Sequence, residues 1–432
     1  MAKAAILEQV GGLTIGEVEL ADPAPHEVLI DTKACGLCHS DLHFIDGAYP
    51  HPLPAIPGHE AAGVVRAVGS EVKTVKPGDH VVSCLSAFCG HCEFCVTGRM
   101  ALCLGGDTRR AQTAAPRITR NGGEPVAQML NLSAFAEQML IHEHACVAID
   151  KDMPLDRAAL IGCSVTTGVG AVIHTSGVRP GETVAVVGAG GVGLACINGA
   201  AIAGAGRIIA IDMQGSKLNP AKEFGATDVV NPKDGDPVAQ VMELTNGLGV
   251  HHSFEAIGLK ATTEQAFKML GRGGTANVIG MIPVGVHIEL HGVDFLAEKR
   301  IQGSTMGSNR FPIDMPRFVD FYMSGKLKLD EMISRRIKLD QVNEAFDELK
   351  RGELARSESV EGGGAVDLNT GGGEVRIPRL RPRLSLKMTE ETPARYVGLP
   401  LARVGYRDES FALADYVPPT LAVRSGSRLG EL

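Results

Sequence analysis

The stretch Val184-Ala-Val-Val187-Gly188-Ala-Gly190-Gly-Val-Gly193 decides the fold. Its apolar start predicts a buried strand, and its glycines run directly into an Ala-rich helix that begins near Leu194. In such a turn Gly188 allows the sharp bend, Gly190 lets the backbone approach a pyrophosphate, and Gly193 permits close packing of helix on strand. The amides at the helix start would face the phosphates, so the predicted cofactor contacts here are Gly188, Gly190, Gly191, Val192 and Gly193.

The next predicted strand, residues 207–212, ends in Asp212, at about the 20-residue distance expected for the carboxylate that binds the ribose. This carboxylate would accept a hydrogen bond from the 2′-hydroxyl and repel a 2′-phosphate, which favours NAD over NADP. The alternative is a glycine-rich turn in a doubly wound domain that binds no cofactor. The strand before the turn, the helix after it and Asp212 together favour the cofactor.

Strands and helices alternate over residues 165–303, which predicts an α/β Rossmann domain with a doubly wound parallel sheet. Residues 1–164 differ, because short alternating runs such as 27–31 and 61–68 predict an antiparallel, barrel-like β domain with little helix. Residues 304–357 contain one predicted helix, 341–350. Residues 358–432 begin with two glycine triplets and are expected to be a poorly ordered extension.

The overall composition excludes some classes of function. The 432 residues carry a formal net charge of −8 and no basic stripe, so we expect no nucleic-acid partner. Residues 184–211 are the least polar stretch, but glycines, Asn198 and Arg207 interrupt it, so no membrane span is expected. The N-terminus does not resemble an export signal, and a cytoplasmic location is expected.

Four of the ten cysteines lie close together in the sequence, at Cys89, Cys92, Cys95 and Cys103. Two successive C-x-x-C steps point three sulfurs at one centre, and the fourth arrives after a short excursion. Four thiolates complete a tetrahedral zinc ion and leave no open position, which is typical of a structural site. Free or redox-active thiols and an iron–sulfur cluster are the alternatives.

A second set of metal-type residues is spread along the chain, at Cys38, His59 and Cys163. Each residue alone is more often part of a core than a ligand. Together they offer two thiolates, one imidazole and an open position, which is the donor set of a catalytic zinc ion. An alcohol on that ion would lose its proton to give a zinc-bound alkoxide, and this would transfer hydride. Ser40 and His43 are suited to carry the proton to solvent.

These motifs, in this order, resemble the medium-chain zinc-dependent alcohol dehydrogenase family over about residues 1–357. The stretch 104–135 resembles the long loop of its class III-like, dimeric branch. The resemblance implies a GroES-like catalytic domain that includes residues 304–357, a homodimer, and a small alcohol or aldehyde as the substrate.

The resemblance also implies roles for single residues. Asp41 would orient His59, and Glu60 would be an acidic neighbour able to approach the metal. Further family-like positions are the cofactor contacts His39, Lys217 and Arg356 and the pocket-lining Leu85 and Phe135. His39 stands where the family often has arginine.

Other readings are a dehydrogenase for the hydroxymethyl adduct of a thiol, a zinc-free reductase, and a non-catalytic binding protein on the same fold. The sequence after Arg356 also shows no apolar strand of the kind with which the family ends. We therefore expect the extension to be dispensable, unless residues 375–386 fold back to replace that strand.

Overall fold

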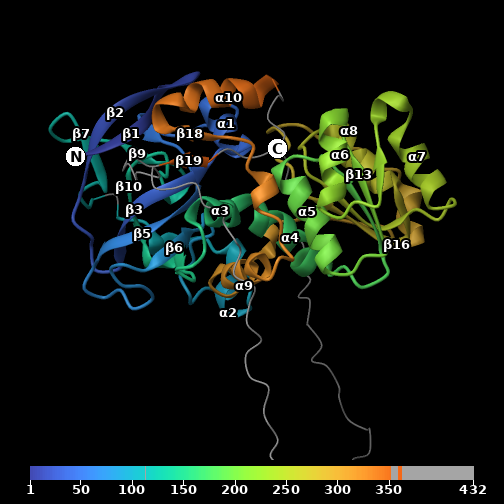
Figure 1. The fold of residues 1–432 in the computed structure, drawn as a ribbon, viewed down its shortest axis with the longest axis horizontal. Helices are drawn as coiled ribbons and strands as arrows, with labels where there is room; N and C mark the ends of the chain where they lie inside the picture. The colour runs from blue at the N-terminus through green and yellow to red at the C-terminus, as the bar shows by residue number, and fades with distance from the viewer. Residues whose placement is uncertain (112, 352–358, 362–432) are drawn as a thin grey trace, which may run out of the picture. The chain divides into compact units, whose positions relative to one another are not determined.

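The computed structural model describes residues 1–111 and 113–351 and the short strand Ser359–Glu361 (Figure 1). A parallel sheet with helices forms the middle of the chain, and antiparallel sheets form the N-terminal part. Both match the fold class expected from the sequence.

The middle of the chain forms the doubly wound domain. Its parallel sheet has the order β14-β13-β12-β15-β16-β17, in which β12 lies beside both β13 and β15. The strands are β12 (Thr183–Val187), β13 (Arg207–Ile211), β14 (Asp228–Val230), β15 (Val250–Glu255), β16 (Leu270–Val278) and β17 (Arg300–Gly303). The helices, green to yellow in Figure 1, are α5 (Gly191–Ile202), α6 (Gly215–Glu223), α7 (Pro237–Leu244) and α8 (Lys260–Lys268). The order reverses at β12, so the glycine turn follows the strand at which a ligand crevice is expected.

The N-terminal part is mainly antiparallel. One sheet has the order β8-β7-β2-β1-β4-β9, and the other contains β11, β6, β5 and β3, with β10 also paired to β3. The strands are β1 (Ala2–Gln9), β2 (Gly12–Leu20), β3 (Glu27–Gly36), β4 (Ala55–Ile56), β5 (Glu60–Val68), β6 (His80–Ser83), β7 (Ile118–Arg120), β8 (Glu124–Pro125), β9 (Ala127–Gln128), β10 (Gln138–His142) and β11 (Cys146–Ala148). The helices are α1 (His39–Ile45) and α2 (Glu93–Val96). Strand β3 therefore leads directly to Cys38, and β5 begins directly after His59.

One continuous helix joins the two parts of the fold. It consists of α3 (Leu155–Leu160), the π-helical turn Ile161–Val165, α4 (Thr166–Gly170) and a second π-helical turn, Ala171–Ser176. Among the described residues this is the one helix, Leu155–Ser176, that is long and apolar enough to cross a membrane, but 83% of its apolar window is buried inside the structure. It packs as a core helix, with Leu160 and Val165 fully buried.

A buried ion pair holds the long loop to the barrel. Glu27, at the start of β3, accepts hydrogen bonds from Arg117 Nε at 2.6 Å and Arg110 Nη2 at 2.5 Å. Burial raises the pKa of Glu27, but the two guanidinium groups and the Ala24 amide outweigh it and lower the pKa to about 2. Both loop arginines are thereby fixed in structural contacts.

The C-terminal part of the described chain returns to the N-terminal sheets, through α9 (Phe311–Met323), β18 (Arg336–Lys338) and α10 (Val342–Arg351). The apolar side of α10 is buried, and Phe346 packs edge-on against Phe135 at 5.8 Å between ring centroids. Helix α10 agrees with the helix predicted at 341–350.

The expectation that no final strand follows Arg356 was wrong. Residues Ser359–Glu361 form β19, which pairs in parallel with β18 and antiparallel with Ala34, Cys35 and Gly36 of β3 (Figure 1). Main-chain pairing on both sides needs no long apolar run, which explains why the sequence did not reveal it. The boundary expected at 357/358 thus falls just before a strand of the sheet that contains β3. The segments 362–432 and 375–386 lie outside the described residues.

We therefore expect a chain that ends at Ser357 to melt about 5 °C or more below the full chain, because main-chain hydrogen bonds worth about 1 kcal/mol each are lost and the Ala34–Gly36 end of β3 becomes an open edge. A chain that ends at Gly364 retains β19 and should keep the melting temperature of the full chain. Differential scanning calorimetry of the three chains tests this. Equal melting temperatures for the two shortened chains would contradict a stabilising role of β19.

Candidate metal and dinucleotide sites

Asp41 organises the start of helix α1. Cys38 is the residue that caps this helix, and the Asp41 carboxylate accepts a hydrogen bond from its backbone N–H at 3.3 Å. The same carboxylate accepts the Gly58 N–H at 3.0 Å and binds His59 Nδ1 at 2.9 Å. Asp41 and His59 are fully buried. One carboxylate therefore holds together two segments that each carry a predicted ligand.

The structure brings Cys38, His59 and Cys163 together, with their ligand atoms all within 4.8 Å of one another. His59 Nε2 lies 3.3 Å from Cys163 Sγ. Nδ1 faces the Asp41 carboxylate, so it is the nitrogen suited to keep its proton when Nε2, which faces Cys163, binds a metal. A hydrogen bond from Cys163 lowers the pKa of the Cys38 thiol well below its ordinary value, although burial opposes this. Two sulfurs and one nitrogen around one point form the donor set that zinc prefers.

Cys163 reaches the other two residues from the π-helical turn Ile161–Val165. The next residue, Ser164, donates to Glu60 Oε1 twice, from its backbone N at 2.9 Å and from its Oγ at 2.5 Å. Glu60 is fully buried, and its second oxygen, Oε2, has no hydrogen-bond partner. Sequence analysis missed Ser164, because a serine after a cysteine carries no recognisable motif.

The unpartnered oxygen of Glu60 tests whether a cation fits this site. Burial and the neighbouring Cys38 raise the pKa of Glu60 to about 8, so its negative charge lacks compensation from the protein. A buried carboxylate is stable when a cation or hydrogen-bond donors surround it. A divalent ion at the Cys38–His59–Cys163 set would supply that charge, so the residues present fit zinc.

The two residues predicted to move the proton lie on α1. The Ser40 hydroxyl donates to the sulfur of Met281 at 3.4 Å, and Met281 lies on the loop that follows β16. The rings of His43 and Tyr49 lie edge to face, with 5.8 Å between their centroids. The Tyr49 hydroxyl in turn donates to the carbonyl of Ile282 at 3.0 Å. Met281 and Tyr49 were not found from the sequence, because the contacts of Ser40 and Tyr49 with this loop join residues more than 200 positions apart.

The four clustered cysteines also meet, with all sulfurs within 4.8 Å of one another. Backbone amides point at the sulfurs, for example Cys92 N to Cys89 Sγ at 3.3 Å and Gly105 N to Cys103 Sγ at 3.3 Å. Backbone hydrogen bonds from His91 and Cys92 lower the pKa of Cys89 to about 6. Burial instead raises the pKa of Cys95 to about 12, so Cys89 is the sulfur that these contacts favour as a thiolate, and the gathering of the four sulfurs is what favours a metal.

The glycine turn has the shape expected from the sequence. Gly188 adopts φ +101°, which side chains rarely tolerate. A Cβ on Gly193 would stand 1.7 Å from the Gly188 carbonyl oxygen, whereas one on Gly190 would meet nothing within 4 Å. Gly190 caps α5, and Gly191 and Val192 begin that helix. The helix and strand therefore pack closely, while the space in front of Gly190 stays open to a ligand.

Asp212 lies beside this turn. Its carboxylate accepts the Ala189 N–H at 2.9 Å and the Gln214 N–H at 2.8 Å, which orients it toward the glycine loop. His39 and Lys217 are two further predicted cofactor contacts. Burial, followed by the positive charge of Lys217, lowers the pKa of His39, so Lys217 of α6 lies close enough to His39 of α1 for their charges to interact. Arg356 lies outside the described residues.

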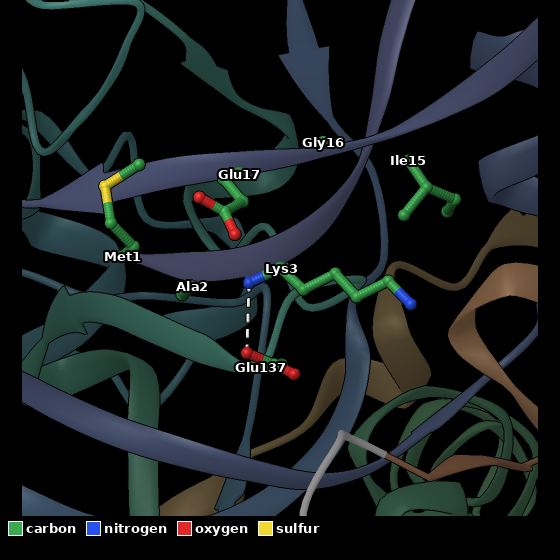
Figure 2. Close-up of a pocket in the computed structure, with 7 residues that line it drawn as sticks. All are labelled: Met1, Ala2, Lys3, Ile15, Gly16, Glu17 and Glu137. Atoms are coloured by element: carbon green, nitrogen blue, oxygen red, sulfur yellow. Dashed lines mark hydrogen bonds between the residues drawn. The ribbon is translucent and has the colours of Figure 1, made fainter.

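Two further positions were expected in the substrate pocket. Leu85 is partly buried, whereas Phe135 is fully buried and packs in the core. A separate hollow of about 410 Å³ lies near the N-terminus, where Lys3 N donates to Glu137 (Figure 2). None of the predicted site residues lines that hollow: its lining is Met1, Ala2, Lys3, Ile15, Gly16, Glu17 and Glu137.

Family comparisons agree with both halves of the fold. The model described as "Alcohol dehydrogenase GroES-like domain" matches residues 24–151, and that described as "Zinc-binding dehydrogenase" matches residues 191–323. The chain is 38% identical to S-(hydroxymethyl)glutathione dehydrogenase of Photobacterium damsela subsp. piscicida, over 80% of this chain and 95% of that one. It is 39% identical to alcohol dehydrogenase class-3 of Pisum sativum, over 80% and 93% respectively.

The structure resembles that of benzyl alcohol dehydrogenase from Acinetobacter calcoaceticus, with a TM-score of 0.77, 33% identity and coverage of 83% of this chain and 99% of that chain. A third family model, described as "Bacterial Type VI secretion, VC_A0110, EvfL, ImpJ, VasE", matches residues 340–432. That match overlaps α10, which packs in the dehydrogenase core, and otherwise falls almost entirely outside the described residues.

Motif, fold and similarity thus agree over the first four fifths of the chain. The chain belongs to the medium-chain, zinc-dependent alcohol dehydrogenase family.

Proposed function

We propose that this protein is an NAD-dependent alcohol dehydrogenase that interconverts a small alcohol and its aldehyde or ketone by reversible hydride transfer. The gathering of Cys38, His59 and Cys163 within 4.8 Å, with a buried carboxylate beside them, carries the proposal. This donor set leaves one ligand position open, which a structural site does not.

Zinc, when bound by these three residues, acts as a Lewis acid that makes the hydroxyl of an alcohol more acidic. Asp41 keeps His59 in the tautomer that binds through Nε2. Ser40 accepts the substrate proton, and His43, further along α1, passes it toward solvent. The Cys89–Cys103 lobe would hold a second, structural zinc, because four thiolates would fill every position of a tetrahedral ion.

NAD binds along the glycine turn. The amides from Gly188 to Gly193 at the start of α5 would hold its pyrophosphate, and Asp212 would accept a hydrogen bond from the ribose. By resemblance to the family, His39 and Arg356 would contact the phosphates and Lys217 would lie near the adenosine ribose.

We further propose a cytoplasmic homodimer. The cysteines of both clusters are free thiols, and they need a reducing compartment to stay so. Strand β17 is the last strand in the order of the described parallel sheet, and nearby Phe295 and Leu296 are 45% and 84% exposed. A second copy would cover both, and light scattering that returned the monomer mass would refute this.

We also propose the division into domains: residues 1–164 and 304–361 form the catalytic domain, and residues 165–303 form the NAD domain.

Formation of NADH at 340 nm with a panel of primary and aromatic alcohols tests the activity. A second panel contains formaldehyde with a low-molecular-weight thiol, because the chain resembles an S-(hydroxymethyl)glutathione dehydrogenase. Turnover that requires the thiol would favour the hydroxymethyl-thiol adduct as the substrate. Absence of turnover in both panels, with zinc and NAD bound, would favour a non-catalytic binding protein.

The purified protein should contain about two zinc ions per chain, one for each ligand set. Cys38→Ser should remove one ion and the activity while the protein stays folded, because the other set is intact. Cys92→Ser should instead lower the melting temperature, because the lobe loses its cross-link. Atomic absorption and calorimetry measure both effects. Loss of both ions in each variant would contradict the division of roles.

Asp212→Gly should shift the preference from NAD toward NADP, because it removes a negative charge that would face the 2′-phosphate. The ratio of kcat/KM for the two cofactors measures the shift, which we expect to be at least about tenfold, a typical value for one lost charge contact. A native protein that already prefers NADP would show that Asp212 has another role.

His43→Ala should slow alcohol oxidation most at acidic pH, where little bulk base is present to replace the imidazole. The measurement is kcat as a function of pH for both proteins, with a saturating alcohol. Buffer imidazole at high concentration should restore part of the lost rate. An unchanged pH profile would remove His43 from the proton path.

A further inference from the structure

Ser164 and Glu60 link the two halves of the catalytic ligand set. Glu60 directly follows His59, and Ser164 directly follows Cys163 in the sequence. They are 104 positions apart, yet both donor groups of Ser164 bind the same oxygen, Glu60 Oε1, at 2.9 and 2.5 Å. The linkage therefore joins the neighbour of one predicted ligand to the neighbour of another.

The two oxygens of Glu60 have unequal surroundings. Oε1 accepts two hydrogen bonds, whereas Oε2 is buried and accepts none. Oε2 also lies against Gly36, two residues before Cys38, where an added Cβ would stand 2.6 Å from it. The carboxylate thus has one oxygen tied down by Ser164 and one oxygen without a partner, on the residue that directly follows His59.

We infer that Ser164 is a positioning residue that restrains Glu60, so that its free oxygen is held in reserve as an additional metal ligand and does not occupy the position meant for substrate. This inference rests on the proposed zinc-dependent function. Hydrogen bonds to a carboxylate are among the strongest in proteins, and they draw electron density from the group. Without the Ser164 hydroxyl, Oε1 keeps only one donor, and Glu60 turns more readily toward the cation.

The test uses cobalt(II) in place of zinc at the Cys38–His59–Cys163 set, because its visible absorption weakens when a fourfold site gains a fifth ligand. In Ser164→Ala this absorption should fall. The KM for the alcohol should rise about tenfold with kcat little changed, as expected when a hydrogen bond to a charged group is lost. Ser164→Thr, which keeps the hydroxyl, should restore both values.

A double-mutant comparison separates this role from general damage to the fold. Glu60→Gln removes the carboxylate, so adding Ser164→Ala to it should change neither the spectrum nor KM. Thr166→Val is the matched control. It deletes another buried hydroxyl of the same helix, which binds the Ile161 carbonyl at 2.6 Å and does not contact Glu60, and it should leave the cobalt spectrum unchanged.

The inference would be overturned if the cobalt spectrum were unchanged in Ser164→Ala. It would also be overturned if Ser164→Ala had the same effect in the wild-type protein and in Glu60→Gln. If Ser164→Ala fails to fold, Ser164→Thr against Glu60→Gln gives the same decision: a Thr variant with a wild-type spectrum supports the inference, and one that matches Glu60→Gln overturns it. The proposed function fails in a different way. If the proposed metal site is wrong, cobalt bound to the protein would give the same thiolate charge-transfer absorption with and without Cys38→Ser, or no such absorption at all.

Discussion

The buried carboxylate of Asp41 is the interaction on which the candidate metal site depends. It accepts the N–H groups of Cys38 and Gly58 and contacts the His59 ring, and these contacts offset part of the burial that raises the pKa of Asp41. A carboxylate in this position is costly unless such donors surround it. The start of α1 and the turn before β5 must therefore come together for either segment to be stable, and this places two ligands side by side.

The third ligand comes from a distant part of the chain. Cys163 lies on the core helix Leu155–Ser176, which shares one hydrophobic core with Ala34 of β3 and Ala62 of β5. The small side chains on these strands let the helix approach closely, and a π-helical turn directs Cys163 to the other ligands. Packing of apolar surfaces thus sets the position of a chemical group, and the Ser164–Glu60 linkage secures it.

The C-terminal boundary of the enzyme follows from the same packing. Phe346 of α10 belongs to the core of the N-terminal sheets, and β19 lies between β3 and β18. The strand that β19 supports is the one that leads to Cys38. The similarity to a type VI secretion family therefore begins inside a segment that packs with the N-terminal sheets, at η11 (Leu339–Gln341) and α10.

Local patterns determined much of this protein. The glycine turn before α5 and the Cys89–Cys103 lobe could be predicted, because their chemistry needs fixed residue types at short spacing. The pairing of β19 with β3, the contact of Ser40 with Met281 and the restraint of Glu60 by Ser164 could not. Each joins residues more than 100 positions apart. Their partners are chosen by how helices and sheets pack, and a one-dimensional pattern does not contain that information.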